Sequence, residues 1–94
     1  MERREAQYFD ELYLKLKQGL ITNLKVQPKY ELIPTLKWND KTLKKRIYKA
    51  DFEYFDLNTK NTVVVDAKGF QTDVYKLKKR LFLLNYTNYI FMEV

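Results

Sequence analysis

The sequence predicts a single α/β domain in which two helices flank a small mixed sheet. Apolar residues recur at three- and four-residue steps near residue 10 and again near residue 80, which is helical spacing. Short runs rich in Ile, Val, Tyr and Phe lie between these segments and are typical of strands. We expect the order helix, three or four strands, helix, strand, within one domain spanning residues 1–94.

The first helix is expected to end near Gly19, because glycine commonly follows a last helical turn. Its acidic residues Glu2 and Glu5 lie in the first turn and its lysines near the end, which suits the helix dipole. The predicted apolar face comprises Phe9, Leu12, Tyr13, Leu16 and Leu20.

Residues 24–38 fall in short apolar runs broken by two prolines, so we expect edge strands or irregular extended pieces there. A turn is expected at 39–41 and a longer strand over 46–57. A second turn at 58–61 and a strand over 62–68, closed by Gly69, would complete a hairpin.

The second helix is expected to begin after Thr72, a residue type that caps helix N-termini. The predicted apolar stripe comprises Val74, Leu77, Leu81 and Leu84, with Tyr75 and Phe82 flanking it. A last strand over 89–94 would then return parallel to the strand over 62–68.

The composition limits the chemistry that this domain could perform. The chain has no Cys and no His, which rules out thiolate zinc sites, Ser-His-Asp triads and His general bases. Any catalysis would use carboxylates, Lys, hydroxyls or a metal held by oxygen. The longest apolar runs are far shorter than a membrane span, and the charged first residues do not resemble a secretory leader. We therefore expect a soluble cytoplasmic protein.

The strongest local signal is the segment 63–69. Strand alternation places Asp66 and Lys68 on one face and the neighbouring valines on the other. An acid and an ammonium at the end of an apolar strand are costly to bury unless they pair or bind something. The alternative is a surface Asp–Lys pair on an edge strand.

The preceding strand carries a second acid, Asp51, among aromatic residues. A hairpin centred near residues 59 and 60 would place Asp51 opposite Lys68 and Asp66 diagonally near Glu53. Diagonal neighbours lie about 7–8 Å apart, a distance that a shared cation can bridge. Two carboxylates and a Lys would thus converge, and Mg²⁺ prefers oxygen sites of that kind.

The spacing of Asp51 and Asp66-Ala67-Lys68 resembles the motif of the PD-(D/E)XK nuclease superfamily, with Ala50 where Pro is expected. The resemblance implies a restriction-endonuclease-like αβββαβ core. The chain is also similar, over nearly its whole length, to a phage and prophage family of unknown function assigned to that superfamily. This closer similarity lies in the blocks 4–6, 27–32, 48–52, 64–69 and 72–78.

The resemblance implies a Mg²⁺- or Mn²⁺-dependent DNA endonuclease, acting in the host cytoplasm if the chain is phage-encoded. Asp51, Asp66 and the backbone carbonyl of Ala67 would hold the metal, and Lys68 would orient the attacking water or stabilise the charge that develops on the phosphate. Glu5 would assist catalysis through a second metal or a water, or would serve only as a helix-dipole acid. Gln27 is a further polar candidate.

Two basic clusters are candidate phosphate contacts, although a solvated helix face is the plainer interpretation for the second. The predicted DNA-binding residues are Lys44, Lys45, Arg46, Lys76, Lys79 and Arg80. The only Trp, Trp38, could stack on a base, lie in the core or join a homodimer interface with Ile33 and Leu36.

Three functions therefore remain open from the sequence. The first is a metal-dependent DNA endonuclease, for which an analogy at the level of the fold suggests branched or recombination intermediates as substrates. The second is a non-catalytic nucleic-acid-binding module of the same fold. The third is a regulatory protein whose basic face, which dominates a net charge of +6, meets an acidic partner.

Overall fold

The computed structural model describes residues 2–67 and 71–94. Its elements, in chain order, are α1 (Arg3–Lys17), β1 (Ile21–Val26), β2 (Lys29–Ile33), β3 (Leu36–Trp38), β4 (Lys41–Leu43), β5 (Arg46–Lys49), β6 (Phe52–Asp56), β7 (Asn61–Asp66), α2 (Asp73–Asn85) and β8 (Ile90–Glu93). No helix in these residues is long and apolar enough to cross a membrane.

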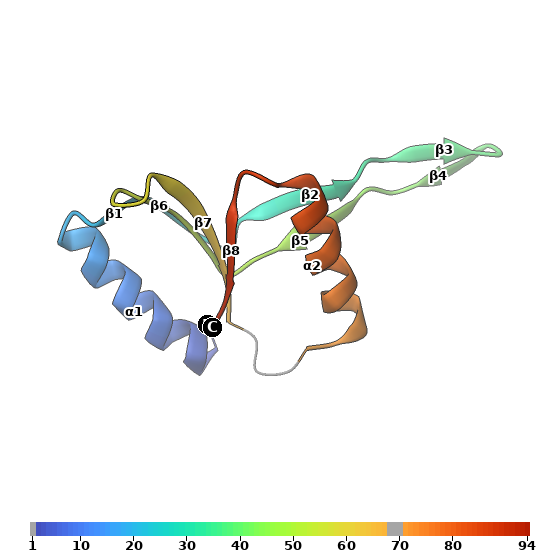
Figure 1. Cartoon of the computed structure of the whole chain (residues 1–94). Coiled ribbons are helices and arrows are strands. Elements are labelled where there is room, and N and C mark those ends of the chain that lie inside the picture. The colour runs from blue at the N-terminus through green and yellow to red at the C-terminus, as the bar shows by residue number, and fades with distance from the viewer. Residues whose placement is uncertain (1, 68–70) are drawn as a thin grey trace.

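A four-stranded mixed sheet with the order β1-β6-β7-β8 forms the centre of the molecule, with α1 and α2 on its two sides (Figure 1). β6 is antiparallel to β1 and β7, whereas β7 and β8 are parallel, as the sequence predicts. The mixed α+β fold class is therefore confirmed. When β2 to β5 are set aside, the remaining order is helix, three strands, helix, strand.

The two faces of the sheet carry separate apolar cores. Val63 and Val65 face α1 and pack with Leu12 and Phe52. Val64, between them in sequence, lies in the other core, which is rich in aromatic rings from α2 and from β2 and β5. This alternation follows from the two-residue period of a strand.

Between β1 and β6 the chain makes a long two-stranded excursion, residues 29–49, which we call the ribbon. Its inner half is β2 paired with β5, and its outer half is β3 paired with β4. The inner half packs against α2, and the outer half projects from the body of the molecule (Figure 1). The molecule is consequently elongated, with extents of 54 × 27 × 17 Å.

The helix termini agree with the sequence, but the buried faces do not. The Thr72 hydroxyl accepts a hydrogen bond from the Tyr75 N–H, which makes Thr72 the N-cap of α2, and Gly19 follows α1 with a φ of +75°. Of the predicted apolar face of the first helix, Tyr13 is exposed and Leu20 lies beyond the end of α1 and is also exposed, whereas Tyr8 packs toward the core.

Most of the predicted apolar stripe of α2 is wrong, although Leu81 does pack against the core. Val74, Leu77 and Leu84 are 64%, 60% and 72% exposed, whereas Tyr75 and Phe82 are buried. The reason is that the surface beneath α2 is made of aromatic rings from the ribbon. Phe82 packs edge-on against Tyr30, with ring centroids 5.0 Å apart.

The single strand expected over residues 46–57 is also wrong. It divides into β5 and β6, which belong to different sheets. The chain changes sheet at Ala50 and Asp51, where the Ala50 N–H donates to the Pro28 carbonyl and the Gln27 N–H donates to the Asp51 carbonyl. This junction joins the ribbon to the central sheet.

The hairpin register differs from the expected one by two residues, since Phe52 pairs with Val65 and not with Ala67. Asp56 sets this register, because its Oδ1 accepts the N–H groups of Asn58 and Thr59 and its carbonyl accepts the Lys60 N–H. Lys60 takes a φ of +60° to close the loop. The turn thus forms one residue earlier than the sequence suggests.

Candidate active site

Asp51 and Asp66 lie beside each other where β6 begins and β7 ends. The Asp51 N–H donates to the Val65 carbonyl at 3.0 Å, and the Asp51 Oδ2 accepts the Ala67 N–H at 2.6 Å. Asp51 is therefore held by the backbone on both sides of Asp66. The predicted position of Asp51 opposite Lys68 falls outside the described residues, whereas Glu53, which pairs with Val64, is diagonal to Asp66 as expected.

Both carboxylates are buried, which rules out the interpretation of Asp66 as a surface acid. Asp66 is 0% exposed and Asp51 is 8% exposed. The Tyr48 hydroxyl, from the inner half of the ribbon, donates a hydrogen bond to the Asp66 Oδ2. Burial, and next the acceptor Asp66, raise the pKa of Tyr48 far above its usual range, so Tyr48 remains a donor.

A second Tyr–acid pair lies next to the first. The Tyr30 hydroxyl donates to the Glu53 Oε1 at 2.6 Å, and the Lys25 ammonium lies 3.3 Å from the Glu53 Oε2. Burial and Glu53 raise the pKa of Tyr30. Both Glu53 oxygens thus have partners, so Glu53 helps to hold the ribbon and β1 in place beside the two aspartates.

Glu5, the predicted catalytic residue of the first helix, belongs to α1. It lies in the first turn of α1, one turn before Tyr8, whose ring is 6.0 Å from that of Phe52. Phe52 and α1 are on the opposite face of the sheet from Asp66. Within residues 2–67 and 71–94, no group of three acidic side chains is arranged to hold an ion.

Two other predicted site residues are Lys68 and Gln27, and the structure describes only the second of them. Lys68 and the strand-closing Gly69 lie outside the described residues, so their placement is not part of the geometry. Gln27 has an exposed side chain, and it meets the site through its backbone, with a φ of +54° and the N–H bond to the Asp51 carbonyl.

A pocket of about 210 Å³ opens next to the Tyr48–Asp66 pair. It is lined by Tyr48, Lys49, Thr72, Val74, Tyr75 and Lys78. Two lysines and the N-terminal end of α2 therefore line the same pocket as Tyr48, which binds Asp66. Such surroundings favour an anionic ligand.

The predicted DNA-binding residues occupy different environments. Lys44, Lys45 and Arg46 are exposed where the two halves of the ribbon meet, and Lys76 and Arg80 are exposed on α2. Lys79 is instead turned to β8, where its ammonium lies 3.1 Å from the Glu93 Oε1 and over the Tyr75 ring.

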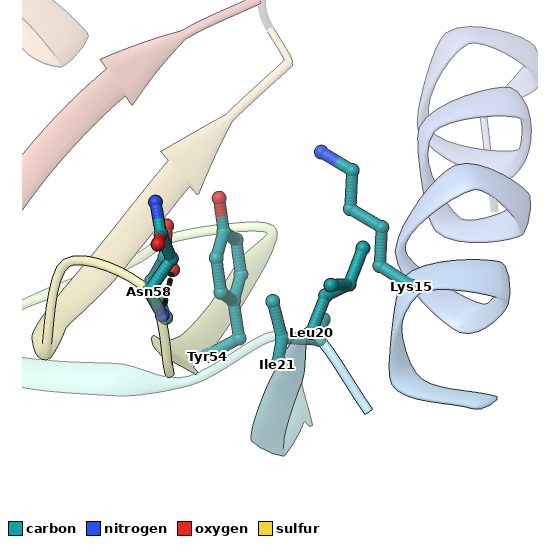
Figure 2. Close-up of a pocket in the computed structure, with 6 residues that line it drawn as sticks. Lys15, Leu20, Ile21, Tyr54 and Asn58 are labelled. Carbon is teal, nitrogen blue, oxygen red and sulfur yellow. Dashed lines mark hydrogen bonds between the residues drawn. The ribbon is translucent and has the colours of Figure 1, made fainter. Parts of the chain in front are cut away.

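A larger pocket, of about 280 Å³, lies at the other end of β6 and has no part in this site (Figure 2). Its lining residues are Lys15, Leu20, Ile21, Tyr54, Asp56 and Asn58. Its one carboxylate, Asp56, already accepts two backbone N–H groups of the turn. Burial and the nearby Tyr8 raise the pKa of Tyr54 to about 12, so its hydroxyl stays protonated at neutral pH.

Sequence reasoning missed Tyr48, which donates a hydrogen bond to Asp66. It groups Lys49 and Lys78 with the basic clusters but does not connect them with the pocket beside Tyr48, which both residues line. The sequence does hold one signal for Tyr48, because it lies in the strand predicted over residues 46–57, which also carries Asp51. What was missing is the pairing of β5 with β2, which places Tyr48 over the end of β7.

A family model described as "Protein of unknown function (DUF1064)" matches residues 2–92. No curated protein and no solved structure matches the chain.

Proposed function

We propose that this chain, which belongs to the DUF1064 family, is a metal-dependent DNA endonuclease that hydrolyses phosphodiester bonds. The observation that supports this proposal most directly is the adjacent placement of Asp51 and Asp66 at neighbouring strand ends. Two carboxylates held side by side repel each other, and a divalent cation relieves that repulsion.

The residues present fit a Mg²⁺ or Mn²⁺ site. Asp51 uses Oδ2 for the Ala67 N–H, which leaves Oδ1 to meet a cation. Asp66 and the Ala67 carbonyl would add oxygens, and water and substrate phosphate commonly complete such a site. A metal bound there supplies a Lewis acid and lowers the pKa of a bound water.

The protein groups around the pair have distinct proposed roles. Tyr48 orients the Asp66 carboxylate through its hydrogen bond. Lys49 and Lys78, which line the adjoining pocket, bind the phosphates next to the scissile bond. Lys68, two residues after Asp66 in the sequence, is assigned the stabilisation of the charge that develops on the phosphate.

Membership of the PD-(D/E)XK superfamily is part of this proposal. Its support is the Asp51 and Asp66-Ala67-Lys68 spacing together with the order helix, three strands, helix, strand that remains outside the ribbon. Action on branched or recombination DNA is an analogy at the level of the fold.

A non-catalytic nucleic-acid-binding module is the second candidate. It is favoured by the structural bonds of both acids, since Asp51 closes the strand end and Asp66 accepts the Tyr48 hydroxyl. Buried acids with such partners can serve the fold alone.

The test is a cleavage assay with Mg²⁺ or Mn²⁺ on linear, nicked, flap and four-way DNA. Wild type should cleave at least one substrate, and Asp66→Asn and Lys68→Met should abolish most of that activity. Asp10→Asn, an exposed acid on α1, is the matched control and should keep the wild-type rate. DNA binding by wild type without cleavage of any substrate would favour the second candidate.

A further inference from the structure

The outer half of the ribbon is an ordered hairpin that stands by itself. β3 and β4 form a separate two-stranded sheet in which Leu36 pairs with Leu43 and Trp38 with Lys41. Asn39 and Asp40 connect them with φ values of +47° and +60°, which suit a two-residue turn of type I′. The hairpin therefore has a defined shape to present to a partner.

This hairpin exposes large apolar side chains. Every residue from Ile33 to Ile47 is exposed, including Leu36 at 57%, Trp38 at 58% and Leu43 at 45%. An isolated two-stranded hairpin is only marginally stable in water. A surface of this kind is typical of a binding element whose partner completes it.

The charge of the ribbon identifies the class of partner. Residues 29–49 contain seven basic residues and two acidic ones, Glu31 and Asp40, so they carry a net charge of +5 out of +6 for the whole chain. The basic residues are Lys29, Lys37, Lys41, Lys44, Lys45, Arg46 and Lys49. Such a concentration of positive charge repels a second copy and attracts a polyanion.

The position and length of the ribbon fit duplex DNA. Its inner end reaches the candidate active site, because Tyr48 binds Asp66 and Tyr30 binds Glu53. The ten residues from Lys29 to Trp38 span at most about 33 Å at strand spacing. One helical turn of DNA is about 34–36 Å long, and a DNA groove admits a two-stranded ribbon.

We propose that the ribbon is a DNA-tracking arm that follows duplex DNA for about one helical turn away from the candidate active site. Lys37 and Lys41 join the other basic residues on the phosphates, and Trp38 lies against the DNA at the far end of the arm. This inference deepens the proposed function and rests on it for the choice of DNA as the partner.

Trp38 permits a direct test, because it is the only Trp in the chain and its fluorescence reports on the outer half alone. A duplex of about three helical turns is titrated into the full chain in EDTA, which prevents cleavage, and Trp38 fluorescence is followed together with anisotropy of the labelled DNA. We expect the fluorescence to fall as the anisotropy rises, with the same midpoint.

One variant tests the contacts of lysines with phosphates, and another tests the contact of Trp38 with the DNA. Lys37→Gln/Lys41→Gln should lower the slope of log affinity against log salt by about 1.8, at roughly 0.9 per phosphate contact. Trp38→Ala should weaken binding about tenfold, the scale of one lost aromatic contact with DNA. The matched control Lys15→Gln/Lys17→Gln removes the same charge from exposed positions on α1 and should leave the slope nearer to the wild-type value.

Three results would contradict the proposal that the ribbon is a DNA-tracking arm. They are an unchanged Trp38 fluorescence at saturating DNA, an equal loss of slope in the α1 control, or a wild-type dimer that Trp38→Ala converts to monomer in light scattering. The last result would assign the outer half to a second copy.

Failure of the arm and failure of the proposed function can be told apart. DNA binding with Trp38 quenching but no cleavage in Mg²⁺ supports the arm and removes the nuclease. Cleavage with wild-type DNA affinity in the Lys37 and Trp38 variants removes the arm and keeps the nuclease.

Discussion

The inner half of the ribbon packs between α2 and the central sheet, whereas the outer half is exposed to solvent. Tyr30 and Tyr48 of the inner half are 6% and 2% exposed, and both contact Phe82 of α2. The end of α2 also holds the inner half by its polar groups, since Asn85 and Tyr86 donate to carbonyls of β2. Trp38, in the outer half, is 58% exposed.

The difference between the halves comes from what lies over them. α2 packs against β2 and β5 of the inner half, whereas the residues of β3 and β4 are exposed. The helix therefore covers only the inner half. The comparison shows that one pair of strands can supply both a wall of the candidate active site and a free surface, depending on what lies over it.

The largest expected contrast between the halves is in stability. Phe82→Ala removes a fully buried ring over the inner half and should lower the free energy of unfolding by about 3–5 kcal/mol. Trp38→Ala in the outer half should change it by less than about 0.5 kcal/mol. Urea unfolding followed by circular dichroism measures both. A large loss in Trp38→Ala would mean that the outer half is packed in solution.

A second contrast is between variants of the candidate active site, which should affect catalysis, and variants of the outer half of the ribbon, which should affect DNA binding. Asp66→Asn and Lys68→Met should each reduce the cleavage rate at saturating DNA by at least about 100-fold, the scale for losing one electrostatic contact in the transition state. Lys37→Gln/Lys41→Gln should raise the DNA concentration needed and leave the saturated rate close to wild type. Wild-type cleavage by purified Lys68→Met would refute the proposed role of Lys68.

The third prediction concerns the buried tyrosine of the inner half at alkaline pH. The pKa of Tyr48 is raised in the folded state, so its contribution to stability is complete below about pH 10, the ordinary tyrosine value, and is lost as the pH rises above it. Tyr48→Phe removes the donor to Asp66 and should cost about 1–3 kcal/mol at neutral pH.

The distinguishing readout is the slope of stability against pH above pH 10, which should be shallower in Tyr48→Phe than in wild type. Tyr13→Phe, at an exposed position on α1, is the control and should follow wild type. Equal slopes in all three proteins would show that Tyr48 ionises in the folded state as easily as in the unfolded one.

The smallest predicted effect concerns how α2 is held over the inner half. Glu93 in β8 accepts hydrogen bonds from Tyr75, Gln71 and Lys79 of the α2 region. The Tyr75 hydroxyl, with help from Lys79, lowers the pKa of Glu93, so this stabilisation is present above about pH 4.5 and is lost as the pH falls below it.

Glu93→Gln should therefore cost about 1 kcal/mol at pH 7, and the difference from wild type should shrink on acidification. Unfolding curves at pH 7 and at about pH 3 make the comparison. A difference that stays constant with pH would assign the effect to packing and not to charge.

Much of the fold could be predicted from the sequence, because its signals are local. The Thr72 cap, the Gly19 terminator and the positions of the central strands depend on residues close in the chain. The parallel pairing of β7 with β8 follows from an intervening helix. The candidate pair Asp51 and Asp66 was also predicted, since both acids follow apolar strand patterns.

The arrangement around that pair was decided only by the tertiary structure. The Asp56 turn shifted the register by two residues, and the change of sheet at Ala50 and Asp51 placed Tyr48 on Asp66. Neither feature can be recognised from the spacing of apolar residues. The turn depends on hydrogen bonds from Asp56 within the loop, and the change of sheet depends on hydrogen bonds between segments distant in sequence.

The sequence by itself determined where the helices and most strands form, through spacing, caps and turns, but not the division of residues 46–57 into β5 and β6. Tertiary packing decided which faces of the helices and strands are buried, and α2 is the clearest case. Its leucine stripe has the stronger helical pattern, yet Tyr75 and Phe82 are buried, because the ribbon offers aromatic rings to pack against. Periodicity reports that a face is apolar, whereas burial depends on a partner surface that only the folded chain provides.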